Sequence, residues 1–350
     1  MKSLNGDSLK LAEEGMGAAP SAARLRCGMT RRQMQYAGIG STIAVAAIIV
    51  LVVAFSGGTS YDSATALSRA YYSKVAYCSD QKSLTDWTCK YCESGPNTLE
   101  SAIVFEDKDT AMQTIVGYDG AEKAIALVFR GSSNIQNWIL NAELSLVAWE
   151  NSDGCDGCYV HEGFQRIWTS IRSRVIDALE QIAAKHGTRT LFTTGHSLGG
   201  AVAVQAALTL SELFTVQTIY TFGAPRVGNE KFASAWNAKL GSKSFRVVHA
   251  ADMFVQIVNS CLSCKHGKYH HTGTEVWYET NDFSRKPSFI GDGSGEDPDG
   301  QLSLGSKAIN PLDHEICEYT FSILFSFDEF FSHGCFFGRH GISQNRLLRE

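Results

Sequence analysis

The 350-residue sequence predicts an α/β fold with a central, mostly parallel sheet flanked by helices. Apolar, β-branched runs of strand length alternate with longer segments of helical character, which is typical of a sheet covered by helices. One run, Thr190–Thr193, passes through a Gly-rich turn into the helix-like segment Ala201–Phe214. Apolar residues make up 44% of the chain, enough to bury a large core.

The turn between that strand and helix is a Gly-x-Ser-x-Gly pattern, Gly195-His196-Ser197-Leu198-Gly199. Between a strand and a helix, this pattern predicts a sharp turn that holds the serine hydroxyl above the sheet. The turn strains the serine backbone, and the glycines leave room for it. The helix N-terminus beside the serine favours a developing negative charge. Ser197 is therefore predicted to be a nucleophile.

The N-terminal part of the chain predicts a membrane anchor. Residues 37–55 are uncharged, and a helix of this length spans about 28 Å, close to the thickness of a bilayer core. Arg24, Arg26, Arg31 and Arg32 precede it, which keeps residues 1–36 cytosolic. We expect a single-pass type II protein with a lumenal or extracellular domain at 61–350. The alternative is a cleaved signal peptide and a secreted domain.

Cysteine usage agrees with export. Of the ten cysteines, six form Cys-x-x-Cys pairs: Cys89/Cys92, Cys155/Cys158 and Cys261/Cys264. In an exported chain these pairs predict short disulfides, with a zinc site as the alternative. Cys27 lies in the predicted cytosolic tail. We expect Cys78 to pair with Cys317 or Cys335, which leaves the other of these two thiols unassigned. The net charge of −5 and the lack of a basic stripe predict no nucleic-acid partner.

The elements of the domain follow in order. A first helix at 61–77 has apolar residues at helical spacing, and we expect it only to pack against the sheet. Strands are predicted where β-branched and apolar residues run together, and helices where apolar residues recur every three or four positions. The predicted strands are 101–105, 114–118, 123–129, 190–193, 218–222, 244–249 and 274–278, and the later helices are 167–184, 201–214 and 230–240.

Two loops are expected to complete the site around the serine. Ser132 follows the strand 123–129 and a glycine, so its backbone N–H is predicted to hold an oxyanion together with the N–H of Leu198. Residues 135–142 form a short amphipathic segment with Ile135, Trp138 and Ile139. This segment is predicted to be a lid that turns outward onto lipid, with a fixed surface helix as the alternative.

Asp252 is the predicted acid. It follows the strand 244–249, at the sheet edge where Ser197 is expected, and it comes after the serine in the chain order Ser, Asp, His. Its role would be to fix the tautomer of a histidine. His161 precedes the nucleophile and is predicted to be structural.

The histidine that would act with Ser197 and Asp252 is predicted from its position in the chain. Six histidines follow Asp252: His266, His270, His271, His314, His333 and His340. His314 follows the polar loop 291–307, which could return the chain to the site. We prefer His314 to His333 on this ground, and both stay open.

These motifs resemble the class 3 lipases, the α/β-hydrolase family of the fungal triacylglycerol lipases, over roughly residues 64–315. The resemblance rests on Leu127–Ser132, Asn137–Ile139, Cys155 with Cys158, Thr194–Ala201, Gly223–Asn229 and His249–Asp252. It implies Ser197 as nucleophile, Asp252 as acid, Ser132 and Leu198 as oxyanion donors and 135–142 as lid. The Phe-rich stretch Tyr319–Phe337 corresponds to no part of the family.

The predicted function is hydrolysis of lipid carboxylic esters by a Ser-His-Asp acyl-enzyme mechanism, at a membrane or lipid interface. This mechanism implies neither a cofactor nor a metal. The alternatives are a phenolic-acid or cell-wall esterase on the same fold and an inactive, membrane-tethered binding domain.

Overall fold

The structure is a computed structural model that describes residues 59–132, 145–150, 155–259, 266–279, 286–307 and 311–314, with Ile316 and Tyr319. All of them belong to one unit, Gly58–Glu350. The predicted tail (1–36) and anchor (37–55) lie outside the described residues. Among the residues that are described, no helix is both long and apolar enough to cross a membrane.

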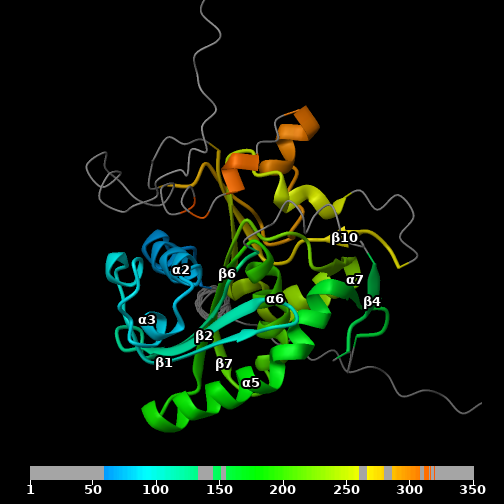
Figure 1. Ribbon diagram of the computed structural model, residues 1–350. Coiled ribbons are helices and arrows are strands. Elements are labelled where there is room, and N and C mark those ends of the chain that lie inside the picture. Colours follow the sequence, from blue (N-terminus) through cyan, green and yellow to red (C-terminus); the bar gives the residue numbers. More distant parts are fainter. Residues whose placement is uncertain are drawn as a thin grey trace, which may run out of the picture. The chain divides into compact units, whose positions relative to one another are not determined.

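An eight-stranded sheet forms the centre of the domain (Figure 1). Its order is β1-β2-β3-β6-β7-β9-β11-β12. The strands β3, β6, β7, β9 and β11 pair in parallel, whereas the pairs β1–β2, β2–β3 and β11–β12 are antiparallel. The predicted α/β fold with a mostly parallel sheet is therefore confirmed. The strands are β1 (Leu99–Asp107), β2 (Met112–Asp119), β3 (Ala124–Phe129), β6 (Thr190–His196), β7 (Thr215–Phe222), β9 (Ser244–His249), β11 (Thr274–Tyr278) and β12 (Phe289–Ile290).

A second, four-stranded sheet was not predicted. It has the order β10-β8-β5-β4, and each strand is only two or three residues long. Segments of two or three residues are too short to show a periodic pattern in the sequence. They become strands only because distant parts of the chain pair with each other. The strands are β4 (Leu146–Ala148), β5 (Tyr159–His161), β8 (Gly228–Asn229) and β10 (Tyr269–His270).

Among the described helices, α2, α3, α5 and α7 begin at side-chain caps that the sequence provides, whereas α6 begins without one. Asp62 accepts from Thr65 N at the start of α2, and Asn229 accepts from Phe232 N at the start of α7. The helices are α2 (Ser63–Val75), α3 (Gln81–Thr85), α5 (Glu162–His186), α6 (Leu198–Leu210) and α7 (Glu230–Leu240). Short 3₁₀ turns are η1 (Cys92–Ser94), η2 (Gly241–Lys243), η3 (Phe254–Asn259), η4 (Gln301–Lys307) and η5 (Pro311–His314).

His161 has the structural role predicted for it. It is the N-cap of α5, where its Nδ1 accepts from the backbone N–H groups of Gly163 and Phe164. Burial lowers the pKa of His161 to about 4. A neutral imidazole is the form that can accept these hydrogen bonds, so burial and capping favour the same protonation state.

Both faces of the sheet are covered, as the alternation along β3 demonstrates. Ile125, Leu127 and Phe129 join the core cluster that contains α5, α6 and α7, whereas Ala126 and Val128 join the cluster that contains α2 and α3. Successive strand residues point to opposite faces, so this pattern requires helices on both sides. Burying each such large apolar side chain contributes about 1.5–3 kcal/mol.

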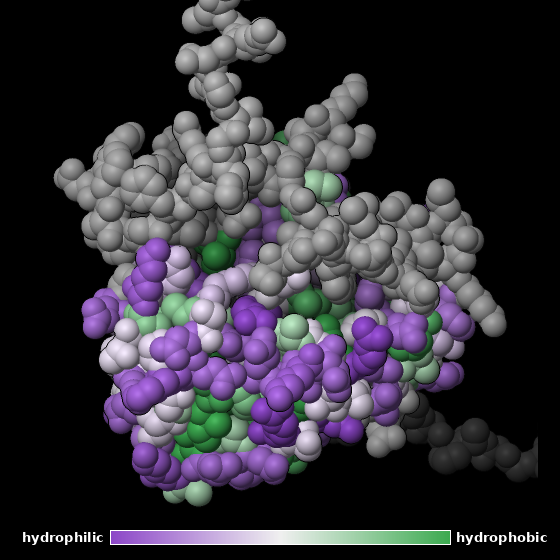
Figure 2. All heavy atoms as spheres, in the orientation of Figure 1, coloured by the Kyte–Doolittle hydropathy of each residue, from purple (hydrophilic) through white to green (hydrophobic). Residues whose placement is uncertain are grey.

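The surface of the described part is mostly polar. On the face seen in Figure 2, hydrophilic side chains predominate and apolar ones gather in small groups. Among the described residues, the large apolar side chains that are exposed are Leu213 and Ile290.

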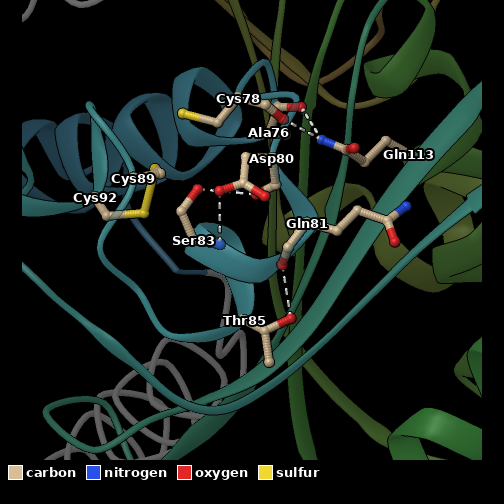
Figure 3. Close-up of a disulfide and its surroundings, with 9 residues drawn as sticks. All are labelled: Ala76, Cys78, Asp80, Gln81, Ser83, Thr85, Cys89, Cys92 and Gln113. Atoms are coloured by element: carbon tan, nitrogen blue, oxygen red, sulfur yellow. Dashed lines mark hydrogen bonds between the residues drawn. A yellow bond between two sulfur atoms is a disulfide. The ribbon is translucent and has the colours of Figure 1, made fainter.

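Two of the predicted cysteine pairs are disulfides. Cys89 is bonded to Cys92 and Cys155 to Cys158, so these four sulfur atoms are not zinc ligands. Cys78 is a free thiol among the described residues, and it lies near the first disulfide in Figure 3. The pair Cys261/Cys264 and the expected partners Cys317 and Cys335 lie outside the described residues.

Candidate active site

Ser197 occupies a strained turn between β6 and α6. Its backbone has φ 56° and ψ −126°, a conformation that non-glycine residues rarely adopt, and the side chain is buried. Its N–H donates to Phe222 O at 2.8 Å, which ties the turn to the end of β7. The strained serine at a helix N-terminus is the arrangement that the sequence pattern predicts.

The glycines of the pattern leave no room for a side chain. A Cβ on Gly195 would lie 2.4 Å from the carbonyl carbon of Gly199, and a Cβ on Gly199 would lie 2.2 Å from Phe129 O. The first turn of α6 therefore packs directly on the backbone of β6 and on the end of β3. This close approach brings the loop after β3 next to the serine.

Asp252 lies at the same edge of the sheet as Ser197. It follows β9, which runs parallel to β7 and thus to β6, and it is completely buried. Phe254 N donates to its Oδ1 at 2.8 Å, and its backbone carbonyl accepts from Gln301 Nε2 at 2.7 Å. The first contact fixes the carboxylate from its own loop, and the second fixes the backbone of Asp252 from η4.

The histidine that the structure brings to Asp252 is His314. Its Nδ1 lies 3.0 Å from Asp252 Oδ1 and 2.9 Å from Oδ2. A carboxylate only accepts, so Nδ1 carries the hydrogen and Nε2 of the neutral ring is left as a hydrogen-bond acceptor. The ring lies between His196 and Phe254, with centroid distances of 4.7 and 4.0 Å. His333 lies outside the described residues.

The serine and the histidine are not hydrogen-bonded to each other. Ser197 Oγ and His314 Nε2 are both buried, and neither has a hydrogen-bond partner among the described residues. Leaving a buried polar atom without a hydrogen bond costs about 1–3 kcal/mol of folding free energy. A hydrogen bond to either atom would remove this cost. In ligand-free enzymes this link is often long and tightens only when substrate binds.

The predicted oxyanion donors lie on α6 and on the loop after β3. Leu198 is the first residue of α6. Ser132 follows Gly131, and a Cβ on Gly131 would lie 3.2 Å from Ser197 Cβ. The loop after β3 therefore passes directly beside Ser197. The predicted lid residues Ile135, Trp138 and Ile139 lie outside the described residues.

Two tyrosines that contact the site were not predicted from the sequence. The Tyr319 hydroxyl is buried and donates to Asp252 Oδ2. Burial, with the charge of Asp252 as a second cause, raises the pKa of Tyr319, so the hydroxyl keeps its proton. Tyr77 follows α2, and its hydroxyl lies 2.7 Å from His196 Nδ1. The segment at 61–77 therefore does more than pack. Neither tyrosine lies in a recognisable motif, so only the three-dimensional structure could identify them.

Comparisons with known proteins agree with the predicted resemblance. Residues 126–260 match the family Lipase (class 3). The chain is 34% identical over 170 residues to the secreted mono- and diacylglycerol lipase 1 of Fusarium solani, an alignment that covers 49% of this chain and 48% of that protein. It is 25% identical over 281 residues to a lipase of Rhizomucor miehei, covering 76% of this chain and 70% of the relative.

Among solved structures, lipase II from Rhizopus niveus superposes with a TM-score of 0.61 at 24% identity, covering 71% of this chain and 91% of that one. This similarity supports the fold. The match to the Fusarium relative spans about half of that protein's length. The resemblance to the class 3 lipases is confirmed.

Proposed function

We propose that this protein is a lipase, a serine hydrolase that cleaves carboxylic esters of lipids such as acylglycerols. The observation that carries the proposal is the His314–Asp252 contact at the sheet edge that also holds the strained Ser197. The relatives described as mono- and diacylglycerol lipases support an acylglycerol as the substrate class.

The proposed chemistry divides ester cleavage into two acyl-transfer steps. His314 Nε2 takes the proton from Ser197 Oγ as the oxygen attacks the ester carbonyl, and Asp252 stabilises the resulting imidazolium. The backbone N–H groups of Ser132 and Leu198 hold the oxyanion. His314 then gives its proton to the departing alcohol, and water releases the acid by the same steps.

Two buried atoms without hydrogen-bond partners in the described part of the structure support Ser197 as the nucleophile and His314 as the base. Ser197 Oγ can donate and His314 Nε2 can accept, and both are buried without another partner among the described residues. A hydrogen bond between them would satisfy both atoms and would prepare the proton transfer.

We also propose where the enzyme acts. Residues 37–55 would anchor the domain at a membrane, or be removed to release it, and residues 135–142 would act as a lid at the lipid surface. The secreted relatives support an exported catalytic domain. The disulfides Cys89–Cys92 and Cys155–Cys158 also support export, because such bonds persist in oxidising compartments.

Hydrolysis of nitrophenyl esters of increasing chain length, in solution and as emulsions, tests the function. A lipase should gain activity on emulsified long-chain esters, and Ser197→Ala should abolish hydrolysis. Preference for soluble phenolic esters would favour the cell-wall esterase. Failure to hydrolyse any ester would favour an inactive binding domain.

A further inference from the structure

The imidazole of His196, the residue before the nucleophile, is hydrogen-bonded through both of its nitrogen atoms. Nδ1 lies 2.7 Å from the Tyr77 hydroxyl, and Nε2 lies 2.6 Å from the backbone carbonyl of His314. The side chain is buried, and its ring also lies against Tyr319 with a centroid distance of 5.6 Å. His196 therefore connects the chain after α2 to the backbone of the catalytic histidine.

The partners of the neutral imidazole determine the direction of both hydrogen bonds. A carbonyl oxygen only accepts, so Nε2 must carry the hydrogen that it shares with His314 O. A neutral imidazole has one N–H, which leaves Nδ1 as an acceptor. The Tyr77 hydroxyl must then donate to Nδ1. The carbonyl of His314 thus sets the tautomer of His196, and the Tyr77 hydroxyl stabilises it by donating to Nδ1.

An uncharged His196 does not repel the positive charge that forms on His314. Burial, and then the neighbouring His314, hold the pKa of His196 well below its ordinary value. When His314 takes the serine proton it becomes an imidazolium, and a second cation at a centroid distance of 4.7 Å would oppose that charge. A neutral hydrogen-bond donor fixes His314 without this penalty.

The structure also holds Tyr77 in place from two directions. Gln113 Nε2 donates to the carbonyls of Ala76 and Cys78, which flank Tyr77, at 2.8 Å each (Figure 3). A Cβ on Gly131 would lie 2.1 Å from the Tyr77 hydroxyl oxygen. The glycine beside the predicted oxyanion donor therefore makes room for this hydroxyl next to Ser197.

We propose that His196 is a positioning residue, a neutral bridge that fixes the backbone of His314 through Nε2–H and whose tautomer is stabilised by the hydroxyl of Tyr77. This inference rests on the proposed hydrolase function. The bridge fixes the backbone of His314, while Asp252 fixes the imidazole ring of His314. Correct placement of the imidazole lowers the barrier to proton transfer, so its loss should reduce kcat and leave substrate binding nearly unchanged.

Three variants test the bridge. His196→Leu removes the donor to His314 O, and kcat should fall about 100-fold, the loss that a misplacement of roughly 1 Å produces. His196→Gln can place an amide N–H where Nε2–H was, so kcat should recover to within about tenfold of wild type. Tyr77→Phe removes the donor that stabilises this tautomer, and kcat should fall about tenfold while KM changes less than about threefold.

Tyr72→Phe is the matched control. Tyr72 is a buried tyrosine on α2 whose hydroxyl donates to Asp119 Oδ2 at 2.8 Å, away from the site. It should lose stability but keep kcat. If His196→Leu does not fold, the comparison of Tyr77→Phe with Tyr72→Phe decides. An active wild type whose Tyr77→Phe variant keeps full kcat, or loses no more than Tyr72→Phe, overturns the bridge and leaves the proposed function standing. A wild type that neither hydrolyses esters nor reacts with a fluorophosphonate at Ser197 overturns both.

Discussion

His314 Nδ1 lies 2.9 Å from Asp252 Oδ2, although 62 residues separate the two in the chain. Asp252 stands on the loop after β9, and His314 stands at the end of η5. The backbone N–H of Ala251 donates to Asp313 Oδ2 at 3.0 Å, so the two loops are also joined next to the His314–Asp252 contact. Several independent contacts thus set the geometry of the pair.

Replacing Asp252 by Asn should reduce kcat by about 10⁴-fold with little change in KM. The amide can donate to Nδ1, which places the remaining imidazole hydrogen on Nε2 and removes the base. Steady-state kinetics on a short-chain nitrophenyl ester measures this. Asp119→Asn is the control, because Asp119 is equally buried but is bonded to Tyr72 and Asn97. A similar loss of kcat in both variants would mean that Asp252 is only structural.

Replacing Tyr319 by Phe should reduce kcat about tenfold and lower the free energy of unfolding by about 1.5–3 kcal/mol, the usual value of a hydrogen bond to a charged group. The hydroxyl donates to Asp252 Oδ2, so its loss leaves the buried carboxylate with one donor fewer. Kinetics and urea denaturation measure the two effects. Tyr61→Phe loses a hydroxyl that bonds only Tyr278 in the described structure, and it should keep kcat. Full activity of Tyr319→Phe would show that His314 and the backbone suffice to hold Asp252.

The buried cap at His161 should make the protein lose stability in mild acid. Its pKa is lowered to about 4 from 6.5, so the folded state binds fewer protons than the unfolded state between these values. The free energy of unfolding should be highest above pH 6.5 and fall by about 3 kcal/mol as the pH drops to 4.

His161→Asn keeps an N-cap acceptor and removes the titrating group. Chemical denaturation between pH 4 and 7 should give this variant a flatter stability profile than wild type. Equal slopes in the two proteins would assign the acid sensitivity to other groups.

Two glycines should respond differently to alanine. At Gly195 a Cβ would lie 2.4 Å from the backbone of Gly199, so Gly195→Ala should cost about 4 kcal/mol or more, or prevent folding. Gly187 ends α5 with φ 68° and has no atom within 4 Å of its added Cβ. Gly187→Ala should therefore cost only about 1–2 kcal/mol, from backbone strain alone. Thermal unfolding ranks the two, and equal losses would contradict the role assigned to close packing.

The sequence predicted the elements whose causes are local. The strand at 244–249 and the helix at 230–240 have the predicted bounds, because continuous apolar runs and a capping Asn229 determine them. The helix predicted at 201–214 begins at Leu198 instead, since the first turn contains Gly199 and Gly200, which do not signal a helix by themselves.

The parts that depend on distant contacts could not be predicted. Tyr77 and Tyr319 lie outside every motif, and their roles arise only because the fold brings them to His196 and Asp252. The choice between His314 and His333 depended on where an irregular loop returns, which neither periodicity nor a turn signal determines.

Labelling with a fluorophosphonate probe tests the central claim most directly, because the probe reports the nucleophile and its base without requiring the natural substrate. We predict one adduct per chain on Ser197, located by mass spectrometry, none in Ser197→Ala, and a rate at least about 100-fold slower in His314→Ala. An adduct on another residue, or an unchanged rate in His314→Ala, would contradict the account.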